Sequence, residues 1–227
     1  MAEKKFSKRE AIGFGWETTT HHLLFFVGLL IIVVVIYAVP NRIGGYISQW
    51  ASQVPEAFQN IGFKILSIFA SLIFAVAVMV LQLTAQLGCL KISLALCDGK
   101  SGRFADLFSC FPFVLKYLAG SILYGLIVVG GVFLLIVPGI IWAMQFQYYG
   151  YLIIDKGLGP VAALKQSSKL TKGVEWDLFL LGLLSGLILL LGVFVLFIGL
   201  FAAIPTTMIA ATYVYRKLST QAEEVKP

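Results

Sequence analysis

The chain has 227 residues, of which 59% are hydrophobic and only 12% are charged, and its mean hydropathy is +0.94. Soluble domains carry about 25% charged residues, so this chain lacks the polar side chains that a water-exposed surface requires. The composition excludes a soluble enzyme, a nucleic-acid-binding domain and a disordered tail, and it indicates an integral membrane protein. The formal net charge of +6 has to be interpreted after the membrane spans are placed.

Six apolar segments are candidates for membrane spans, since a helix needs roughly 20 residues, with a range of about 17–25, to cross a bilayer. In chain order they are 23–39, 61–96, 113–137, 140–154, 176–198 and 202–215. The first is expected to end at Pro40, and no small-residue cleavage site follows it, so we expect an uncleaved span rather than a signal peptide. The fourth and sixth are short, and re-entrant segments are the alternative for both.

The positive charges lie on one side of these six spans. Fifteen of the seventeen Lys and Arg residues fall in the N-terminus, the C-terminus and the connections between hairpins, whereas Arg42 and Lys64 lie on the opposite side. Lys and Arg accumulate in cytoplasmic loops, so we expect both termini in the cytoplasm and the chain in a prokaryotic cell membrane. The charge is therefore mainly an orientation signal, and we expect no nucleic-acid partner.

A segment typical of a short interfacial helix precedes each pair of spans. The first opens at Ser7 and Glu10, which have the spacing of a capping box. The second has four apolar residues at the spacing of one helical face: Phe104, Leu107, Phe108 and Phe111. Pro160 and Gly173 bracket the third, because proline suits a first helical turn and glycine the position after the last.

We therefore expect one all-α, polytopic membrane domain over 1–227, built from three hairpins of spans that each follow an interfacial amphipathic helix. Its expected parts are an N-terminal interfacial segment (1–22), a first hairpin (23–97), two units of interfacial helix plus hairpin (98–155 and 156–218) and a cytoplasmic tail (219–227).

The last two units align at an offset of 61 residues, which indicates an internal repeat. The alignment pairs Gly131 with Gly192 and superposes two steps of small residues four positions apart. These steps are Ser121 with Gly125 and Gly182 with Gly186. Small residues at this spacing let helix backbones approach closely, so we expect these four residues to mediate helix packing.

No ionisable residue lies near the middle of a predicted span, which argues against proton-coupled pumps, voltage sensors and many ion-coupled transporters. The notable polar residues are glutamines, namely Gln82 and Gln86 in the second span and Gln145 and Gln147 in the fourth. Hydrogen bonding between packed helices is the interpretation that we favour. The alternative is a polar groove or pore lined by these four side chains.

We expect no catalytic residue, no metal site and no cofactor. The chain has none of the motifs of serine hydrolases, zinc proteases or phosphate-binding loops. His21 and His22 are adjacent, so on a helix they point about 100° apart and do not readily share one ion. The three cysteines, Cys89, Cys97 and Cys110, form neither a CxxC pair nor an even set.

Lys165, Lys169 and Lys172 share one face of the helix expected after Pro160. Basic residues beside a membrane contribute about 1 kcal/mol each against an anionic leaflet. We expect these lysines, together with Arg103, to contact anionic phospholipid headgroups of the bilayer. Orientation and anchoring of the helix alone are the alternative.

The stretch 134–173 combines several short motifs: Val137-Pro138-Gly139, an aromatic span, Asp155, Gly159-Pro160, Ala163-Leu164 and Leu170-Thr171-Lys172-Gly173. It resembles a broad group of bacterial and archaeal multi-pass membrane families. The group includes uncharacterised inner-membrane proteins and the membrane domain attached to some glycerophosphodiester phosphodiesterases. The resemblance implies six spans with repeated interfacial helices. The chain has no room for an appended catalytic domain, so phosphodiesterase activity is not expected.

The leading hypothesis is a non-catalytic scaffold or accessory protein that contacts anionic lipids, another membrane protein or a second copy of itself. The alternative is a transporter or channel for a neutral or lipidic solute that uses the four glutamines. A membrane-embedded enzyme acting on lipid ranks below both. A continuous cavity that reaches the glutamines favours transport, and a sealed, glycine-packed core favours the scaffold.

Overall fold

The computed structural model describes residues 6–55, 61–195 and 199–224, and no strand occurs within these ranges. The elements are α1 (Lys8–His21), α2 (Leu23–Ser52), α3 (Ile61–Cys97), η2 (Phe104–Leu107), η3 (Phe111–Phe113), α4 (Val114–Leu134), α5 (Ile136–Phe146), α6 (Tyr149–Lys156), α7 (Pro160–Thr171), α8 (Glu175–Phe194) and α9 (Leu200–Glu224). The all-α prediction is thus confirmed for this part of the chain. Parts of the predicted N-terminal segment (1–5), fifth span (196–198) and tail (225–227) lie outside the described residues.

Four helical segments are long and apolar enough to cross a membrane, which supports a membrane location. They are Leu23–Ser52, Ile61–Cys97, Phe104–Leu134 and Glu175–Phe194. The second matches the predicted span 61–96 closely. At 37 residues it is about 55 Å long, far more than the roughly 30 Å hydrocarbon core. The predicted fourth and sixth spans are not among the four, so a total of six spans stays a prediction.

The predicted fourth span, 140–154, is broken into two helices. α5 has only 11 residues, and α6 begins at Tyr149. Hydroxyl groups of α7 bind the backbone at the break: Ser167 Oγ donates to the carbonyl of Gln145 and accepts from the amide of Tyr148, at 2.8 and 3.2 Å. Such side chains satisfy the backbone groups that a broken helix leaves free. The apolar pattern of 140–154 contained no sign of these contacts.

Pro40 does not end the first long helix, contrary to the prediction from the sequence. α2 continues through Pro40 to Ser52, although the following residues are turn-like in composition. Proline removes one backbone hydrogen bond, and membrane helices tolerate this loss. α3 runs alongside this stretch, and a Cβ on Gly44 would lie 3.3 Å from the ring of Phe74. The neighbouring helix therefore accompanies the chain past the proline.

The predicted interfacial helix over Phe104–Phe111 is wrong in its conformation. The segment forms two 3₁₀ turns, η2 and η3, rather than one α-helix. Leu107 is buried on α3, where a Cβ on Gly88 would lie 2.3 Å from the Leu107 Cα. Phe108 and Phe111 stay exposed. The apolar spacing identified the residues, but the close contact with Gly88 and the proline inside η3 favour short turns.

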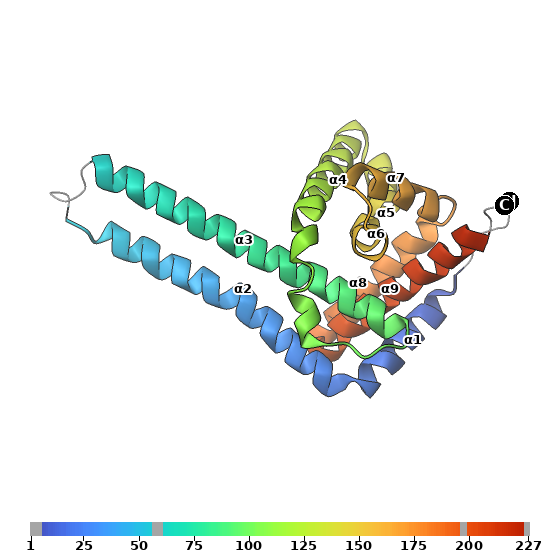
Figure 1. Ribbon diagram of the computed structural model, residues 1–227. Coiled ribbons are helices and arrows are strands. Elements are labelled where there is room, and N and C mark those ends of the chain that lie inside the picture. Colours follow the sequence, from blue (N-terminus) through green and yellow to red (C-terminus); the bar gives the residue numbers. More distant parts are fainter. Residues whose placement is uncertain (1–5, 56–60, 196–198, 225–227) are drawn as a thin grey trace.

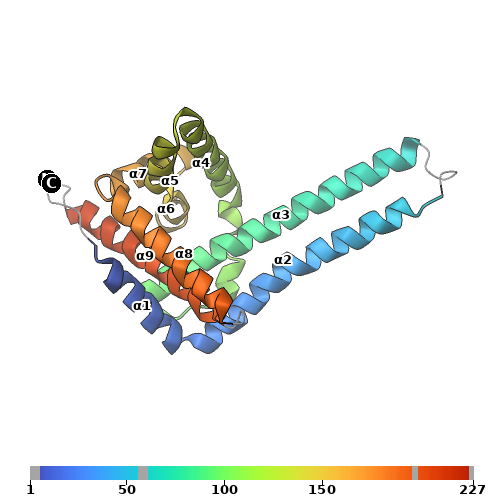
Figure 2. The same cartoon turned by 180° about the vertical axis from the view of Figure 1, so that it is seen from behind.

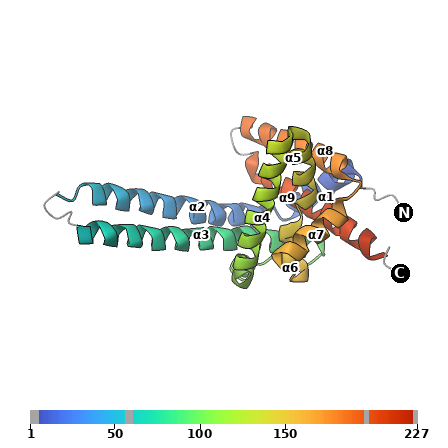
Figure 3. The ribbon, with the colours of Figure 1, turned by 90° about the horizontal axis from the view of Figure 1, so that it is seen from above.

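α2 and α3 form a long antiparallel hairpin that projects from the remaining helices, as Figures 1, 2 and 3 show. Its outer part is apolar and exposed, and none of the most apolar 18-residue window of α3 is buried. The inner end of α3, from Thr84 to Leu96, carries the buried residues of this helix. The hairpin is therefore anchored at one end only, and lipid is the natural cover for its apolar outer part.

α1 lies along α9, on the far side of the bundle from the hairpin tip (Figure 2). The two helices cross closely at Gly15, where a Cβ would lie 2.4 Å from the backbone oxygen of Thr206. Phe14 packs its ring against Tyr213, with centroids 4.9 Å apart. These contacts bring the beginning of α1 beside the last turns of α9.

We expect Gly15→Ala to lower the free energy of unfolding by about 1–3 kcal/mol, because the added methyl group overlaps the α9 backbone. Gly13→Ala is the matched control in the same helix, since a Cβ there meets no atom within 4 Å. That variant should be neutral or gain about 0.5–1 kcal/mol from helix propensity. Unfolding in mixed micelles by a denaturing detergent measures both values, and equal effects would contradict the close crossing.

Candidate functional site

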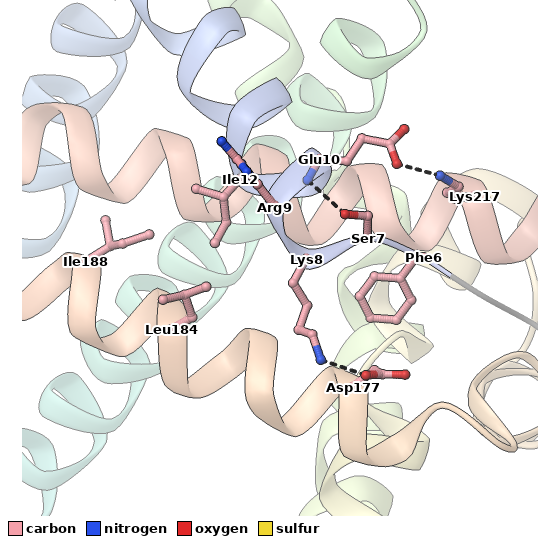
Figure 4. A pocket seen from close by; sticks show the side chains of 10 residues that line it. All are labelled: Phe6, Ser7, Lys8, Arg9, Glu10, Ile12, Asp177, Leu184, Ile188 and Lys217. Atoms are coloured by element: carbon pink, nitrogen blue, oxygen red, sulfur yellow. Dashed lines mark hydrogen bonds and ion pairs between the residues drawn. The ribbon is translucent and has the colours of Figure 1, made fainter.

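A cleft of about 990 Å³ opens between the start of α1, α8 and the end of α9, and we call it the α1–α8 cleft (Figure 4). Its lining is charged at one end and apolar at the other: Phe6, Ser7, Lys8, Arg9, Glu10, Ile12, Asp177, Leu184, Ile188 and Lys217. The volume lies at the upper end of the range of about 300–1,000 Å³ for ligand sites. The cleft is therefore large enough for an organic ligand.

The first turn of α1 positions the charged end of the cleft. Ser7 caps the helix as predicted, because its hydroxyl oxygen accepts a hydrogen bond from the Glu10 amide at 3.3 Å. The reciprocal half of the predicted capping box is absent from the described contacts, since the Glu10 carboxylate binds α9 instead. It accepts a hydrogen bond from the Tyr213 hydroxyl and pairs with Lys217 Nζ at 2.9 Å. The glutamate thus joins α1 to α9.

A second ion pair joins α1 to α8. Lys8 Nζ lies 2.7 Å from a carboxylate oxygen of Asp177, which belongs to the first turn of α8. Both side chains are partly exposed, and exposed pairs contribute about 0–1 kcal/mol to stability. The two bridges therefore set the geometry of the cleft mouth more than the stability of the fold.

Arg9 is the third cationic residue of the cleft mouth. Its side chain is exposed, and within the described residues it makes no ion pair. The two carboxylates of the mouth already bind Lys8 and Lys217. Among the residues that the structure describes, the guanidinium of Arg9 is therefore without an acidic partner and can meet an anionic ligand.

A separate charged cluster joins the ends of three helices. The Arg216 guanidinium in α9 donates to Asp98, just after α3, at 2.7 Å and to Asp155 in α6 at 2.8 Å. The hydroxyl of Tyr215 donates to the other oxygen of Asp155 at 2.8 Å. Charges that satisfy one another in this way are typical of a structural cluster. Asp155, which belongs to the motif-rich stretch 134–173, therefore stabilises the fold through these contacts.

The four basic residues predicted to contact lipid are all exposed. Lys165 and Lys169 lie on α7, and Lys172 follows its last residue. α7 itself confirms the prediction, since it begins at Pro160 and is followed by Gly173 with a φ of +90°. Its other side packs into the bundle through Ala163, Leu164, Ser167, Leu170 and Thr171. Arg103 lies on a different segment, immediately before η2.

The four glutamines do not form one network within the described residues. Gln145 Nε2 donates to Glu175 at 3.0 Å, and the Nε2 atom of Gln147 is buried without a hydrogen-bond partner in this part of the chain. Gln82 and Gln86 lie on α3, Gln82 partly buried and Gln86 exposed, and no hydrogen bond between described residues joins them to the other two. The predicted groove lined by all four is therefore not assembled here.

Close helix approach occurs at other glycines than those predicted to mediate it. A Cβ on Gly125, Gly182 or Gly186 meets nothing within 4 Å, and Ser121 Oγ donates to a carbonyl of its own helix. Gly182 and Gly186 instead line a second cavity of about 300 Å³ together with Gln147. The role of these four residues in helix packing stays a prediction.

Close contacts between pairs of glycines lie near the tips of two helical hairpins. A Cβ on Gly131 would lie 2.9 Å from the Gly139 Cα, and one on Gly199 would lie 2.7 Å from the Gly192 Cα. The alignment of the last two units pairs Gly131 with Gly192, and this pairing is the feature of the sequence that could have indicated the two glycine contacts.

No group of three or more His, Cys, Asp or Glu residues is arranged to hold a metal ion in the ranges that the structure describes. His21 ends α1, and His22 forms the corner between α1 and α2, with Nδ1 3.1 Å from the carbonyl oxygen of Thr18.

We expect Asp155→Asn to lower the free energy of unfolding by about 1–3 kcal/mol, because it weakens a partly buried ion pair and the contact with Tyr215. Asp98→Asn should cost less, since the Asp98 side chain is 32% exposed against 17% for Asp155 and Arg216 keeps its other partner. Unfolding in mixed micelles compares the two variants, and an equal or larger loss for Asp98→Asn would refute this ranking.

The pKa of Glu10 lies below its ordinary value of 4.5, because of the hydrogen bond from Tyr213 and the contact with Lys217. The stabilisation from Glu10 is therefore fully present above that ordinary value and is lost as the pH falls through the lowered pKa. We expect the difference in melting temperature between the unchanged protein and Glu10→Gln to shrink from about pH 6 to about pH 3. Glu17→Gln, at an exposed position of α1, is the control and should show no such trend.

No family model matches the chain, and no solved structure matches it significantly. The chain is 29% identical over 145 residues to the uncharacterized protein Mb2590 of Mycobacterium bovis and to the uncharacterized protein MT2637 of Mycobacterium tuberculosis. It is 28% identical over the same length to the uncharacterized protein Rv2560 of M. tuberculosis. Each match covers 63% of this chain and 44% of the relative. The chain thus has distant mycobacterial relatives and matches less than half of their length.

Proposed function

We propose that this chain is a non-catalytic membrane protein that acts as a scaffold or accessory by binding anionic lipid headgroups. The observation that carries the proposal is the exposed lysine face of α7, made by Lys165, Lys169 and Lys172. Basic residues beside an anionic leaflet contribute about 1 kcal/mol each, so three on one face give a substantial lipid preference. Arg103 adds a fourth exposed charge at another point of the surface.

The packing of α7 supports this proposal, because the helix holds its lysines outward. Ser167 and Thr171 both donate to the carbonyl of Gln145, at 2.8 and 3.0 Å, and fix the inner face of α7 against α5. Leu164 and Leu170 are buried on the same inner side. The lysine face is therefore part of a rigid surface rather than a loop.

The proposal includes a prokaryotic cell membrane with both termini in the cytoplasm. The concentration of Lys and Arg on one side of the predicted spans supports this orientation. The bridge between Glu10 in α1 and Lys217 in α9 agrees with it, because it holds the two ends of the described chain on one side of the bundle.

An internal repeat of the last two hairpins belongs to the same proposal, as does kinship with the membrane domain attached to some glycerophosphodiester phosphodiesterases. The repeat is supported by the close contacts of Gly131 with Gly139 and of Gly192 with Gly199. The alignment pairs Gly131 with Gly192, and the partners Gly139 and Gly199 differ by one position.

Passage of a neutral or lipidic solute is the second candidate. It is favoured by the buried Nε2 of Gln147, which has no hydrogen-bond partner among the described residues and lies beside a cavity of about 300 Å³. The cavity lining contains none of the other three glutamines, so it supports a local site better than a path across a membrane.

The variant Lys165→Gln/Lys169→Gln/Lys172→Gln tests the leading proposal. The protein is reconstituted into vesicles of phosphatidylglycerol and phosphatidylcholine, solubilised gently, and its retained lipids are quantified. We expect the unchanged protein to retain phosphatidylglycerol preferentially, and the triple variant to lose most of that preference, because each lysine contributes about 1 kcal/mol.

Arg42→Gln/Lys64→Gln removes two charges from the other predicted side and is the control that should keep the preference. Added salt should reduce the preference of the unchanged protein, since ions screen exposed charges. An undiminished preference in the triple variant would sink the proposal.

A further inference from the structure

We infer that the α1–α8 cleft binds one molecule of anionic phospholipid, with its phosphate on Arg9 and an acyl chain along Leu184 and Ile188. This inference deepens the proposed function and depends on it, because it adds one discrete site to a general preference for anionic lipid. It uses residues of α1 and α8 that take no part in the lysine face of α7.

The charge of the cleft mouth fits a single phosphate. The mouth contains Lys8, Arg9 and Lys217 against Glu10 and Asp177, so its net charge is one positive unit. The two lysines lie 2.7 and 2.9 Å from their carboxylate partners, and the guanidinium of Arg9 pairs with no acid in the part of the chain that the structure describes. Guanidinium groups bind phosphate oxygens through two parallel hydrogen bonds, and they do so better than an ammonium group does.

The apolar wall of the cleft fits an acyl chain. Leu184 and Ile188 are four residues apart on α8 and therefore lie on the same side of the helix. Figure 4 shows both side chains on the same side of the cleft as Ile12 of α1. Leu184 is 38% exposed, so part of its side chain is open to contact with an acyl chain in the cleft.

The spacing between the two ends matches the length of one leaflet. Asp177 at the charged mouth and Ile188 at the far end of the wall are eleven residues apart on α8, or about 16 Å at 1.5 Å per residue. Half of the roughly 30 Å hydrocarbon core is about 15 Å. A phosphate at the mouth would therefore place the chain of the same lipid along the whole apolar wall.

A soluble phosphate ester fits this arrangement less well than a lipid. It would use Arg9 and the mouth, but it would leave Ile12, Leu184 and Ile188 uncovered. Burial of apolar area contributes about 25 cal/mol per Å², so covering this wall favours a ligand with a hydrocarbon chain. An arginine without an acidic partner among the described residues and a continuous apolar wall together favour an amphiphilic anion as the ligand.

Native mass spectrometry of the full chain in detergent micelles tests the inference with phosphatidylglycerol and phosphatidylcholine as probes. We expect one phosphatidylglycerol molecule to bind more tightly than all others, and phosphatidylcholine to bind that site about tenfold more weakly. Arg9→Gln should weaken the tight binding about tenfold, because the variant loses the charge-assisted hydrogen bonds to the phosphate. Arg9 is exposed, so this variant should fold normally. Arg9→Lys should bind with intermediate affinity.

Leu184→Trp fills the apolar wall and should also weaken the tight binding. Leu183→Trp is its matched control, because Leu183 is the adjacent exposed leucine and does not line the cleft. Arg42→Gln is the control for the loss of an exposed arginine, because Arg42 lines no part of the cleft. Tight binding that is unchanged in both Arg9→Gln and Leu184→Trp, or equal for the two lipids, would overturn the inference.

Two further arms distinguish lipid binding in the cleft from binding of a soluble phosphate ester and from binding at the lysine face of α7. Glycerol 3-phosphate, which has the phosphate without acyl chains, should leave the tight lipid bound, and its displacement of that lipid would overturn the commitment to a lipid. The triple variant of Lys165, Lys169 and Lys172 should lose weakly bound anionic lipids and keep the tight one. If Arg9→Gln has no effect while the triple variant loses lipid, the cleft fails and the proposed function stands. If instead Arg9→Gln loses the tight lipid while the triple variant loses none, the cleft is supported and the lysine face is rejected.

Discussion

The contact of Arg216 with Asp98 and Asp155 is the interaction on which the arrangement of the bundle depends. It joins the inner end of α3 to α6 and α9. α9 in turn holds α1 through the crossing at Gly15 and the bridge between Glu10 and Lys217. α6 leads into α7, which carries the lysine face. Both candidate lipid surfaces, the α1–α8 cleft and the lysine face, are therefore positioned from the same cluster.

The apolar composition imposes a second constraint, because the long hairpin of α2 and α3 has no protein cover along its outer part. The inner end of α3 is held by buried contacts such as Gly88 with Leu107. Beyond it, apolar side chains such as Ile73 and Val76 are exposed. A bilayer can cover such a surface without leaving backbone polar groups unpaired in lipid, since a helix makes its backbone hydrogen bonds internally.

Features with local causes could be predicted from the sequence. The bounds of α3, the cap at Ser7 and the limits of α7 at Pro160 and Gly173 depend on residues within a few positions of each other. The break at Tyr148 could not be predicted, because its cause is Ser167 of another helix. The same holds for the α1–α8 cleft, where Lys8 meets Asp177, 169 positions away in the chain. The spacing of apolar residues along the chain describes a single helix, whereas the break at Tyr148 and the α1–α8 cleft arise from contacts between different helices.

The pairing of charges explains how one set of basic residues can serve both structure and binding. Lysines and arginines that meet an acid join separate segments: Lys8, Lys91, Lys156, Arg216 and Lys217. Arg9, Arg103, Lys165 and Lys172 make no ion pair within the described ranges, and all four are exposed. Most acids of the described ranges are thus used in contacts between segments, so much of the net positive charge is left on the surface. An excess distributed in this way is available to anionic headgroups without weakening the contacts between helices.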